Sequence, residues 1–281
     1  MENYQARTFT APFLFTEGIE GPACDRAGNI YAVNYSTQGT IGIVSPQGQG
    51  SVFVELPGGS IGNGIRFSSR GEMFIADYTN HNILKVDMHT LKCSVHAHEP
   101  LMNQPNDIAI TSDDIIFASD PDWGSGTGNL WRINLDGTTQ LLDSNMGTTN
   151  GIEVSPDEEV LYVNESVQRR IWAYTLDKDK NIHNKRLFIE FPDYSLDGMR
   201  CDMAGNLYVT RHGKGVVAKL SPSGDILEEI SLEGMQCTNL TFGGPEGKHC
   251  YVTVADQGNI QMFLVDTPGR CWGMRQKNEI R

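Results

Sequence analysis

Short apolar runs recur along the chain at a nearly constant interval, and each follows a turn and carries an aromatic residue at the same place. The runs cover residues 28–33, 71–76, 114–119, 159–164, 205–210 and 248–253, with the aromatic residues Tyr31, Phe74, Phe117, Tyr162, Tyr208 and Tyr251. Successive copies lie roughly 42 to 47 residues apart, the length of one four-stranded propeller blade. A second run that ends in a glycine-containing turn follows several of them, as in 41–48, 130–137 and 217–224. Because six copies close a ring with only short edges, the pattern predicts an all-β, six-bladed β-propeller.

The whole chain is expected to form this one propeller. No linker or change of composition divides it, so residues 1–281 are predicted to be a single domain. Propellers remove an exposed edge when an N-terminal strand joins the last blade. The β-prone segment Arg7-Thr-Phe-Thr is predicted to be that outer strand. The rest of the last blade is expected at 250–254 and 260–264, with a further short segment at 270–274.

Oxygen-bearing side chains stand in register just before the aromatic strands. We call them the ring residues: Glu20, Asn63, Asn106, Asn150, Asp197 and Thr238. Inner strands run along the axis of a propeller, so these positions should face one point in a central channel. Two carboxylates and several amides would repel or stay unsatisfied there, whereas one hard divalent cation relieves both problems. Without His or Cys in the ring, Ca²⁺ is favoured over Mg²⁺ or Mn²⁺, and Zn²⁺ suits it less. The alternative is that Asn and Asp only cap turns, which explains Asn63 but not Glu20.

A second register lies three residues beyond the aromatic positions and comprises Asn34, Asp77, Asp120, Glu165, Arg211 and Val254. For Asp77 and Glu165 a structural or solvent-facing role is favoured. Asp120 enters the glycine-rich stretch Gly124 to Gly128, which we expect to cover the site like a lid, although the residue could simply start a turn. His212 is expected either at the mouth of the channel or in a structural contact.

Composition excludes several classes of partner. A net charge of -13 and a pI near 4.9, with no basic stripe, argue against nucleic acid. No apolar run approaches the length of a membrane span, and residues 1–10 lack a secretion signal, which favours the cytoplasm. The 6 cysteines show no CxxC spacing and are predicted to be free thiols. We expect a monomer or a weak homo-oligomer.

Motifs in blade order carry a family resemblance. They are Glu20-Gly-Pro, Pro105-Asn-Asp, Ser119-Asp-Pro, Thr149-Asn-Gly-Ile, Asp197-Gly-Met and Thr238-Asn-Leu-Thr-Phe-Gly-Gly-Pro. Over nearly its whole length the chain resembles the family of senescence marker protein (regucalcin), gluconolactonase and luciferin-regenerating enzyme, and within it the gluconolactonase branch. The squid diisopropyl-fluorophosphatase is a more distant member.

The resemblance implies roles for individual residues. Glu20, Asn150 and Asp197 match the metal ligands of the family, and Asn106 matches a fourth amide that binds metal, water or substrate. Asp197 also matches the carboxylate proposed as base or nucleophile. Asp120 matches an acidic residue that some lactonases of the family need.

Two positions depart from the family pattern, and they concern metal and substrate binding. Arg200 stands where the fluorophosphatase has an Asp ligand for a second calcium, which puts a second site in doubt. Gln104 stands where regucalcin has a substrate-binding arginine, so substrate recognition must differ. Substrate contacts are therefore assigned to Asn106, Gln104, Asp120 and His212.

These observations predict a metal-dependent hydrolase that opens a small sugar-type lactone through Lewis-acid activation of the carbonyl and attack by water. The alternatives are a phosphotriester or fluorophosphate hydrolase at the same metal, and a calcium-binding propeller without enzymatic activity. An intact carboxylate ring beside a glycine-rich loop favours an enzyme over a scaffold.

Overall fold

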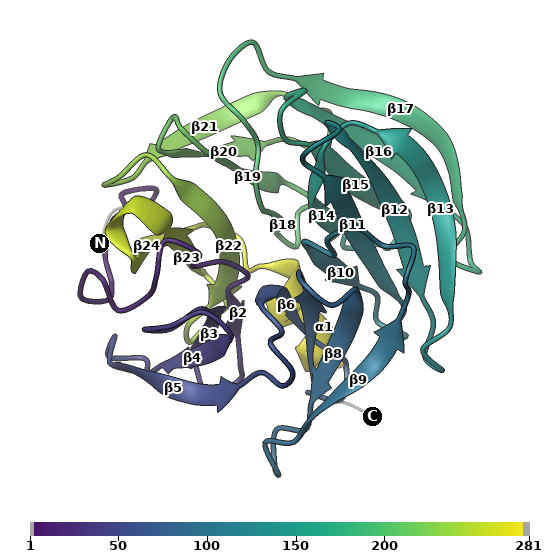
Figure 1. Ribbon diagram of the computed structural model, residues 1–281. Coiled ribbons are helices and arrows are strands. Elements are labelled where there is room, and N and C mark those ends of the chain that lie inside the picture. The colour runs from purple at the N-terminus through teal and green to yellow at the C-terminus, as the bar shows by residue number, and fades with distance from the viewer. Residues whose placement is uncertain (1–2, 278–281) are drawn as a thin grey trace.

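Six four-stranded sheets stand around a common axis in the computed structural model, which describes residues 3–277 (Figure 1). The predicted six-bladed all-β propeller is confirmed. In the first five blades the strands follow chain order within each sheet, and neighbouring strands are antiparallel. The first blade contains β2 (Ala23–Cys24), β3 (Ile30–Val33), β4 (Thr40–Val44) and β5 (Gly50–Glu55). The second contains β6 (Gly62–Phe67), β7 (Met73–Asp77), β8 (Asn82–Val86) and β9 (Cys93–His98).

The next three blades repeat this arrangement, and the first strand of each lies nearest the axis (Figure 1). The third blade contains β10 (Ile108–Ile110), β11 (Ile116–Asp122), β12 (Thr127–Ile133) and β13 (Thr139–Met146). The fourth contains β14 (Thr149–Val154), β15 (Val160–Glu165), β16 (Arg170–Leu176) and β17 (Ile182–Glu190). The fifth contains β18 (Met199–Cys201), β19 (Leu207–Arg211), β20 (Val216–Leu220) and β21 (Ile226–Ser231).

The sixth blade joins the two ends of the chain. Its inner strands are β22 (Cys237–Gly243), β23 (His249–Val254) and β24 (Asn259–Leu264), with the 3₁₀ helix η1 (Ala255–Gln257) before β24. The outer strand is β1 (Arg7–Thr8), which pairs antiparallel with β24 in the register Arg7 to Met262 and Thr8 to Gln261. The predicted N-terminal closure is therefore confirmed.

The expectation of a further strand-like segment at 270–274 is wrong, because these residues begin helix α1 (Arg270–Lys277). The open edge of β24 is already occupied by β1, so the sixth blade offers no place for another strand. The helix packs instead against β22 near the centre of the ring (Figure 1). The Arg270 guanidinium, 3% exposed, binds Glu153 at 3.3 Å and Glu158 at 3.0 Å. Among the residues that the structure describes, no helix is long and apolar enough to cross a membrane.

The hydrophobic core lies between neighbouring blades rather than in one central mass, and the repeated aromatics explain why. Each belongs to a different apolar cluster between its own blade and the next; Tyr31, for example, lies 5.5 Å (ring centroids) from Phe67 of the second blade. Tyr208 of the fifth blade likewise meets Phe242 of the sixth at 5.1 Å. The sequence period therefore records the repeated contact that holds adjacent blades together.

Candidate active site

The ring residues line one cavity of about 500 Å³ at the centre of the propeller. All of them contribute: Glu20, Asn63, Asn106, Asn150, Asp197 and Thr238. Backbone hydrogen bonds join neighbouring blades at this level, since the Gly64 N–H donates to the Asn106 carbonyl and the Gly198 N–H donates to the Thr238 carbonyl, both at 2.8 Å. These bonds hold the starts of the inner strands close together, which brings side chains from distant parts of the sequence into one site.

Glu20 and Asp197 are neighbours in this cavity although they come from the first and fifth blades. Glu20 accepts a hydrogen bond from the Asn239 amide at 2.9 Å, and the side chains of Asn150 and Glu20 lie close enough to Asp197 to affect its pKa. Burial and then the charge of Asp107 raise the pKa of Glu20 to about 7. Burial and then the charge of Glu20 raise the pKa of Asp197 well above its ordinary value. The raised pKa values show that the surrounding protein does not stabilise two negative charges here, and a bound cation would favour the ionised form of both carboxyls.

Two amide oxygens in the same cavity have no hydrogen-bond partner. They are Oδ1 of Asn106 and Oδ1 of Asn150, and both atoms are buried. Buried oxygens of this kind are normally satisfied, and they are suitable ligands for a hard cation. The described part of the chain contains no group of three or more His, Cys, Asp or Glu side chains arranged to hold a metal. The four residues therefore suit one hard cation only as a mixed set of two carboxylates and two amides.

A buried ion-pair cluster lies next to the ring residues. Its central residue is Asp107, which directly follows Asn106 and which the sequence analysis did not predict. Asp107 is fully buried, with its oxygens 3.2 Å from the Arg66 guanidinium and 3.1 Å from that of Arg200. Burial alone would raise the pKa of Asp107, but the charges of Arg200 and Arg66 lower it, so the carboxylate is ionised. Positive charge beside the ring is thus supplied by this chain's own arginines.

A signal for Asp107 exists in the repeat. The same register holds glycine in four blades, at Gly21, Gly64, Gly151 and Gly198. These glycines leave room for larger side chains from the other two blades, since a Cβ on Gly64 would lie 2.5 Å from Oδ1 of Asp107. Asp107 is the one carboxylate in a register that is mostly glycine. Arg66 and Arg200 lie three positions after the ring residues of two other blades. Together these positions could have predicted a carboxylate near the axis with arginines beside it.

The second register organises loops and does not line the channel as a ring. All six of its members, from Asn34 to Val254, are buried. The Asp77 carboxylate accepts hydrogen bonds from Ser60 and Asn82, both at 2.8 Å, and Glu165 accepts one from the backbone of Gly147 at 2.9 Å. Only Asn34 borders the cavity. The structural role favoured for Asp77 and Glu165 therefore agrees with these contacts.

Asp120 is fully buried, and both of its oxygens are engaged by protein donors. Oδ1 accepts the backbone N–H groups of Asn103 and Gln104, both at 2.7 Å. Oδ2 accepts the Trp131 indole N–H at 2.9 Å and the Asn129 amide at 3.2 Å. Asp120 does not line the cavity. Its geometry favours a role in positioning the segment 103–104 over direct contact with a substrate.

The remaining predicted substrate contacts lie on the rim. His212 lines the cavity, and burial lowers the pKa of its imidazole. Gln104 lies in an adjoining outer pocket that shares Tyr78 and Trp123 with the cavity. The glycine-rich lid is shorter than expected, because β12 begins at Thr127 and only residues 123–126 remain as a hairpin loop. Tyr78 and Trp123, which the sequence analysis did not single out, are the aromatic side chains of this rim.

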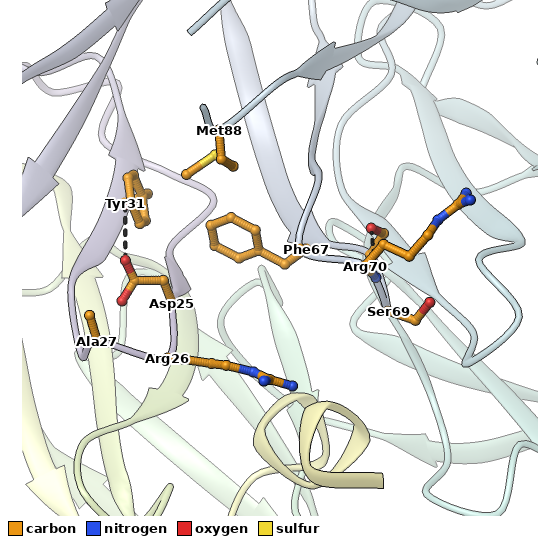
Figure 2. A pocket seen from close by; sticks show the side chains of 10 residues that line it. Asp25, Arg26, Ala27, Tyr31, Phe67, Ser69, Arg70 and Met88 are labelled. Atoms are coloured by element: carbon orange, nitrogen blue, oxygen red, sulfur yellow. Dashed lines mark hydrogen bonds between the residues drawn. The ribbon is translucent and has the colours of Figure 1, made fainter. Parts of the chain in front are cut away.

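A separate cavity of about 570 Å³ opens between the first two blades (Figure 2). The Tyr31 hydroxyl donates to Asp25 at 3.0 Å, and Phe67 and Met88 lie beside them, while the Arg70 side chain points away (Figure 2). None of the ring residues lines this cavity, so it is distinct from the candidate active site.

Known proteins resemble this chain in sequence and in fold. A gluconolactonase of Zymomonas mobilis is 26% identical over 260 residues, which cover 80% of this chain and 72% of the relative. Pentonolactonase XacC of Haloferax volcanii is 28% identical over 153 residues, 53% of each protein. The solved structure of a calcium-binding regucalcin from Agrobacterium tumefaciens matches with a TM-score of 0.80 at 20% identity, covering 93% of this chain and 95% of that one.

Residues 18–256 match the family described as the SMP-30/Gluconolactonase/LRE-like region. This match spans the ring residues of all six blades and agrees with the resemblance carried by the sequence motifs. The chain belongs to the SMP-30/gluconolactonase/luciferin-regenerating enzyme-like family.

Proposed function

We propose that this protein is a metal-dependent lactonase that hydrolyses a sugar-type lactone at the ring cavity. The observation that carries the proposal is the meeting of Glu20 and Asp197 with the unpartnered amide oxygens of Asn106 and Asn150 in one cavity. Support also comes from relatives named gluconolactonase, pentonolactonase and 6-deoxy-6-sulfogluconolactonase, although the last two matches span only about half of the relatives.

Glu20, Asn106, Asn150 and Asp197 would hold one divalent cation, with Ca²⁺ preferred because all four offer oxygen ligands. When bound, such an ion supplies Lewis-acid polarisation of a lactone carbonyl. The chemistry of the donor set favours a hard ion over Zn²⁺, since neither His nor Cys is among the four.

The protein side chains would orient the attacking water and transfer protons. Asp197 borders the cavity and would orient the attacking water and accept its proton. Water adds to the carbonyl carbon, the ring C–O bond breaks, and the released alkoxide takes up a proton to give a hydroxy acid. The same residue would accept the hydroxyl proton of an acid in the reverse, ring-closing direction. Asn106 and His212 would contact the substrate, and Asp120 would fix the segment that carries Gln104.

The proposal is tested by following acid release from glucono-δ-lactone after chelation and after adding back single metals. We expect activity to disappear on chelation, to return with Ca²⁺, and to be lost in Asp197→Asn. Asn63→Ala is the matched control, because Asn63 lines the same cavity outside the proposed ligand set, and it should keep its metal dependence. Full activity after chelation, or in Asp197→Asn, would reject the mechanism. Hydrolysis of phosphotriesters without opening of any lactone would favour the alternative enzyme class.

A further inference from the structure

A larger outer pocket of about 850 Å³ adjoins the ring cavity. Tyr78 and Trp123 belong to the walls of both, so they lie at the boundary between the two spaces. Tyr78 directly follows β7 and Trp123 directly follows β11, and the Trp123 side chain lies close enough to Tyr78 to affect the pKa of its hydroxyl. A molecule whose reacting group lies at the ring could therefore extend past this aromatic pair into the outer pocket.

The outer pocket has apolar surface on residues 100–104, a segment that hydrogen bonds fix in place. Leu101 is 74% exposed and lines the pocket, as does Trp123 at 38%. The Leu101 N–H donates to Glu99 at 3.0 Å, and Asp120 holds the two N–H groups of Asn103 and Gln104. An exposed leucine on a segment pinned by these bonds loses little conformational freedom when a ligand covers it.

Charge in the two spaces is negative or neutral. Among the described residues that line them, none is Lys or Arg, whereas Glu17, Glu20, Asp122 and Asp197 are carboxylates. Arg66 and Arg200, the arginines beside the ring, are both bound to Asp107 and do not line either space. Arg211 is 1% exposed and is engaged by Asp193 at 2.8 Å. A phosphate, sulfonate or carboxylate on a substrate would meet no positive side chain in either space.

We propose that this site selects neutral lactones that carry an apolar alkyl or aryl substituent. The lactone ring would lie at the ring residues, and the substituent would lie in the outer pocket against Leu101 and the Tyr78–Trp123 pair. This inference rests on the proposed lactone hydrolysis, but it changes the preferred substrate from a polar sugar-type lactone to a neutral lactone with an apolar substituent. Leu101 and Trp123 are then specificity-determining residues, and Asp120 positions the segment that presents Leu101.

The test compares kcat/KM for δ-valerolactone, δ-decalactone (the same ring with a pentyl chain), glucono-δ-lactone and its phosphate monoester. We expect δ-decalactone to exceed δ-valerolactone by at least tenfold, and the phosphate monoester to fall at least a hundredfold below glucono-δ-lactone. Leu101→Ala should lower the ratio of kcat/KM for δ-decalactone to kcat/KM for δ-valerolactone by about tenfold, which is typical for lost apolar contacts in a pocket. Leu227→Ala is the matched control, since Leu227 is 52% exposed on the outer strand β21. It should leave all four values unchanged.

Binding separates failure of this inference from failure of the proposed function. Calorimetry with the two corresponding lactams, which the enzyme does not open, should give at least tenfold tighter binding for the pentyl-substituted one, and Leu101→Ala should remove the difference. Absence of lactone hydrolysis with this binding pattern intact would reject the lactonase and keep the apolar subsite. Equal binding of both lactams, equal kcat/KM for both neutral lactones, or efficient hydrolysis of the phosphate monoester would overturn the inference.

Discussion

Removing residues 1–10 should open the ring of blades while leaving every ring residue in place. This segment supplies β1, the outer strand of the sixth blade. The N–H of Tyr4 donates to Leu264, and the N–H groups of Phe9 and Thr10 both donate to Ile260, whose own N–H donates to the Thr10 hydroxyl at 3.0 Å. Truncation removes these four bonds, the pairing of Arg7 and Thr8 with β24, and the bond from the Thr8 hydroxyl to Glu233, and it exposes the edge of β24.

The expected loss of stability follows from these contacts. At about 1 kcal/mol net for each hydrogen bond, the four bonds contribute about 4 kcal/mol. Phe9 adds its edge-to-face contact with Tyr251, at 5.0 Å between ring centroids, which is worth about 1 kcal/mol more. These contacts alone give a loss of about 5 kcal/mol, which in a protein of this size lowers Tm by at least roughly 10 °C.

Differential scanning calorimetry of the truncated and full-length proteins measures this effect. Phe9→Ala should account for about 1 to 2 kcal/mol of it. Phe13→Ala is the matched control, because Phe13 is 76% exposed and its substitution should change Tm little. A truncated protein that melts at the full-length temperature would show that closure of the ring does not depend on β1.

Three further predictions concern buried charge and the positioning residue. Asp107→Asn leaves two buried guanidiniums without their carboxylate, so the free energy of unfolding in a urea titration should fall by about 3 to 5 kcal/mol; an unchanged midpoint would refute the ion-pair cluster. Burial alone would raise the pKa of Glu158, but the Lys180 hydrogen bond and the charge of Arg270 lower it in the folded protein. Ionised Glu158 therefore stabilises the fold above its unfolded pKa of about 4.3, and this contribution is lost as the pH falls through the lower folded pKa. The Tm difference between wild type and Glu158→Gln should thus be larger at pH 7 than at pH 3, and a constant difference would contradict the assignment. Asp120→Ala should lower kcat/KM on the order of tenfold to a hundredfold while Ca²⁺ still binds, with Asp120→Asn intermediate because it keeps one acceptor oxygen; full activity in both variants would remove Asp120 from the site.

The parts of the fold that repeat could be predicted from the sequence. Tyr31 and its counterparts recur because each fills the same interface between neighbouring blades, so the period directly reflects packing. The ring residues could be found for the same reason, since equal register in a closed ring means convergence on the axis. Features that occur once carry no such signal. Helix α1 has only 8 residues and little amphipathic pattern, and its place depends on β1 having taken the edge of β24.

The partners of individual side chains were beyond the sequence. Asp120 stands in a register that includes other acidic residues, but only the structure shows that its oxygens hold the segment 103–104. The same holds for Tyr78 and Trp123, which come from neighbouring blades and meet through loop geometry. The register of Asp107 among glycines marks the position as unusual, but only the structure shows that its carboxylate binds arginines 41 and 93 residues away.

Calorimetric titration of the metal-free protein with Ca²⁺ tests the central claim most directly, because it asks whether the ring binds a cation independently of any substrate. We expect one site in the wild type, with affinity weakened more than tenfold in both Glu20→Gln and Asp197→Asn, since each change removes a ligand charge. Absence of binding in the wild type, or the same stoichiometry and affinity in both variants, would contradict the assignment of the ring as a metal site.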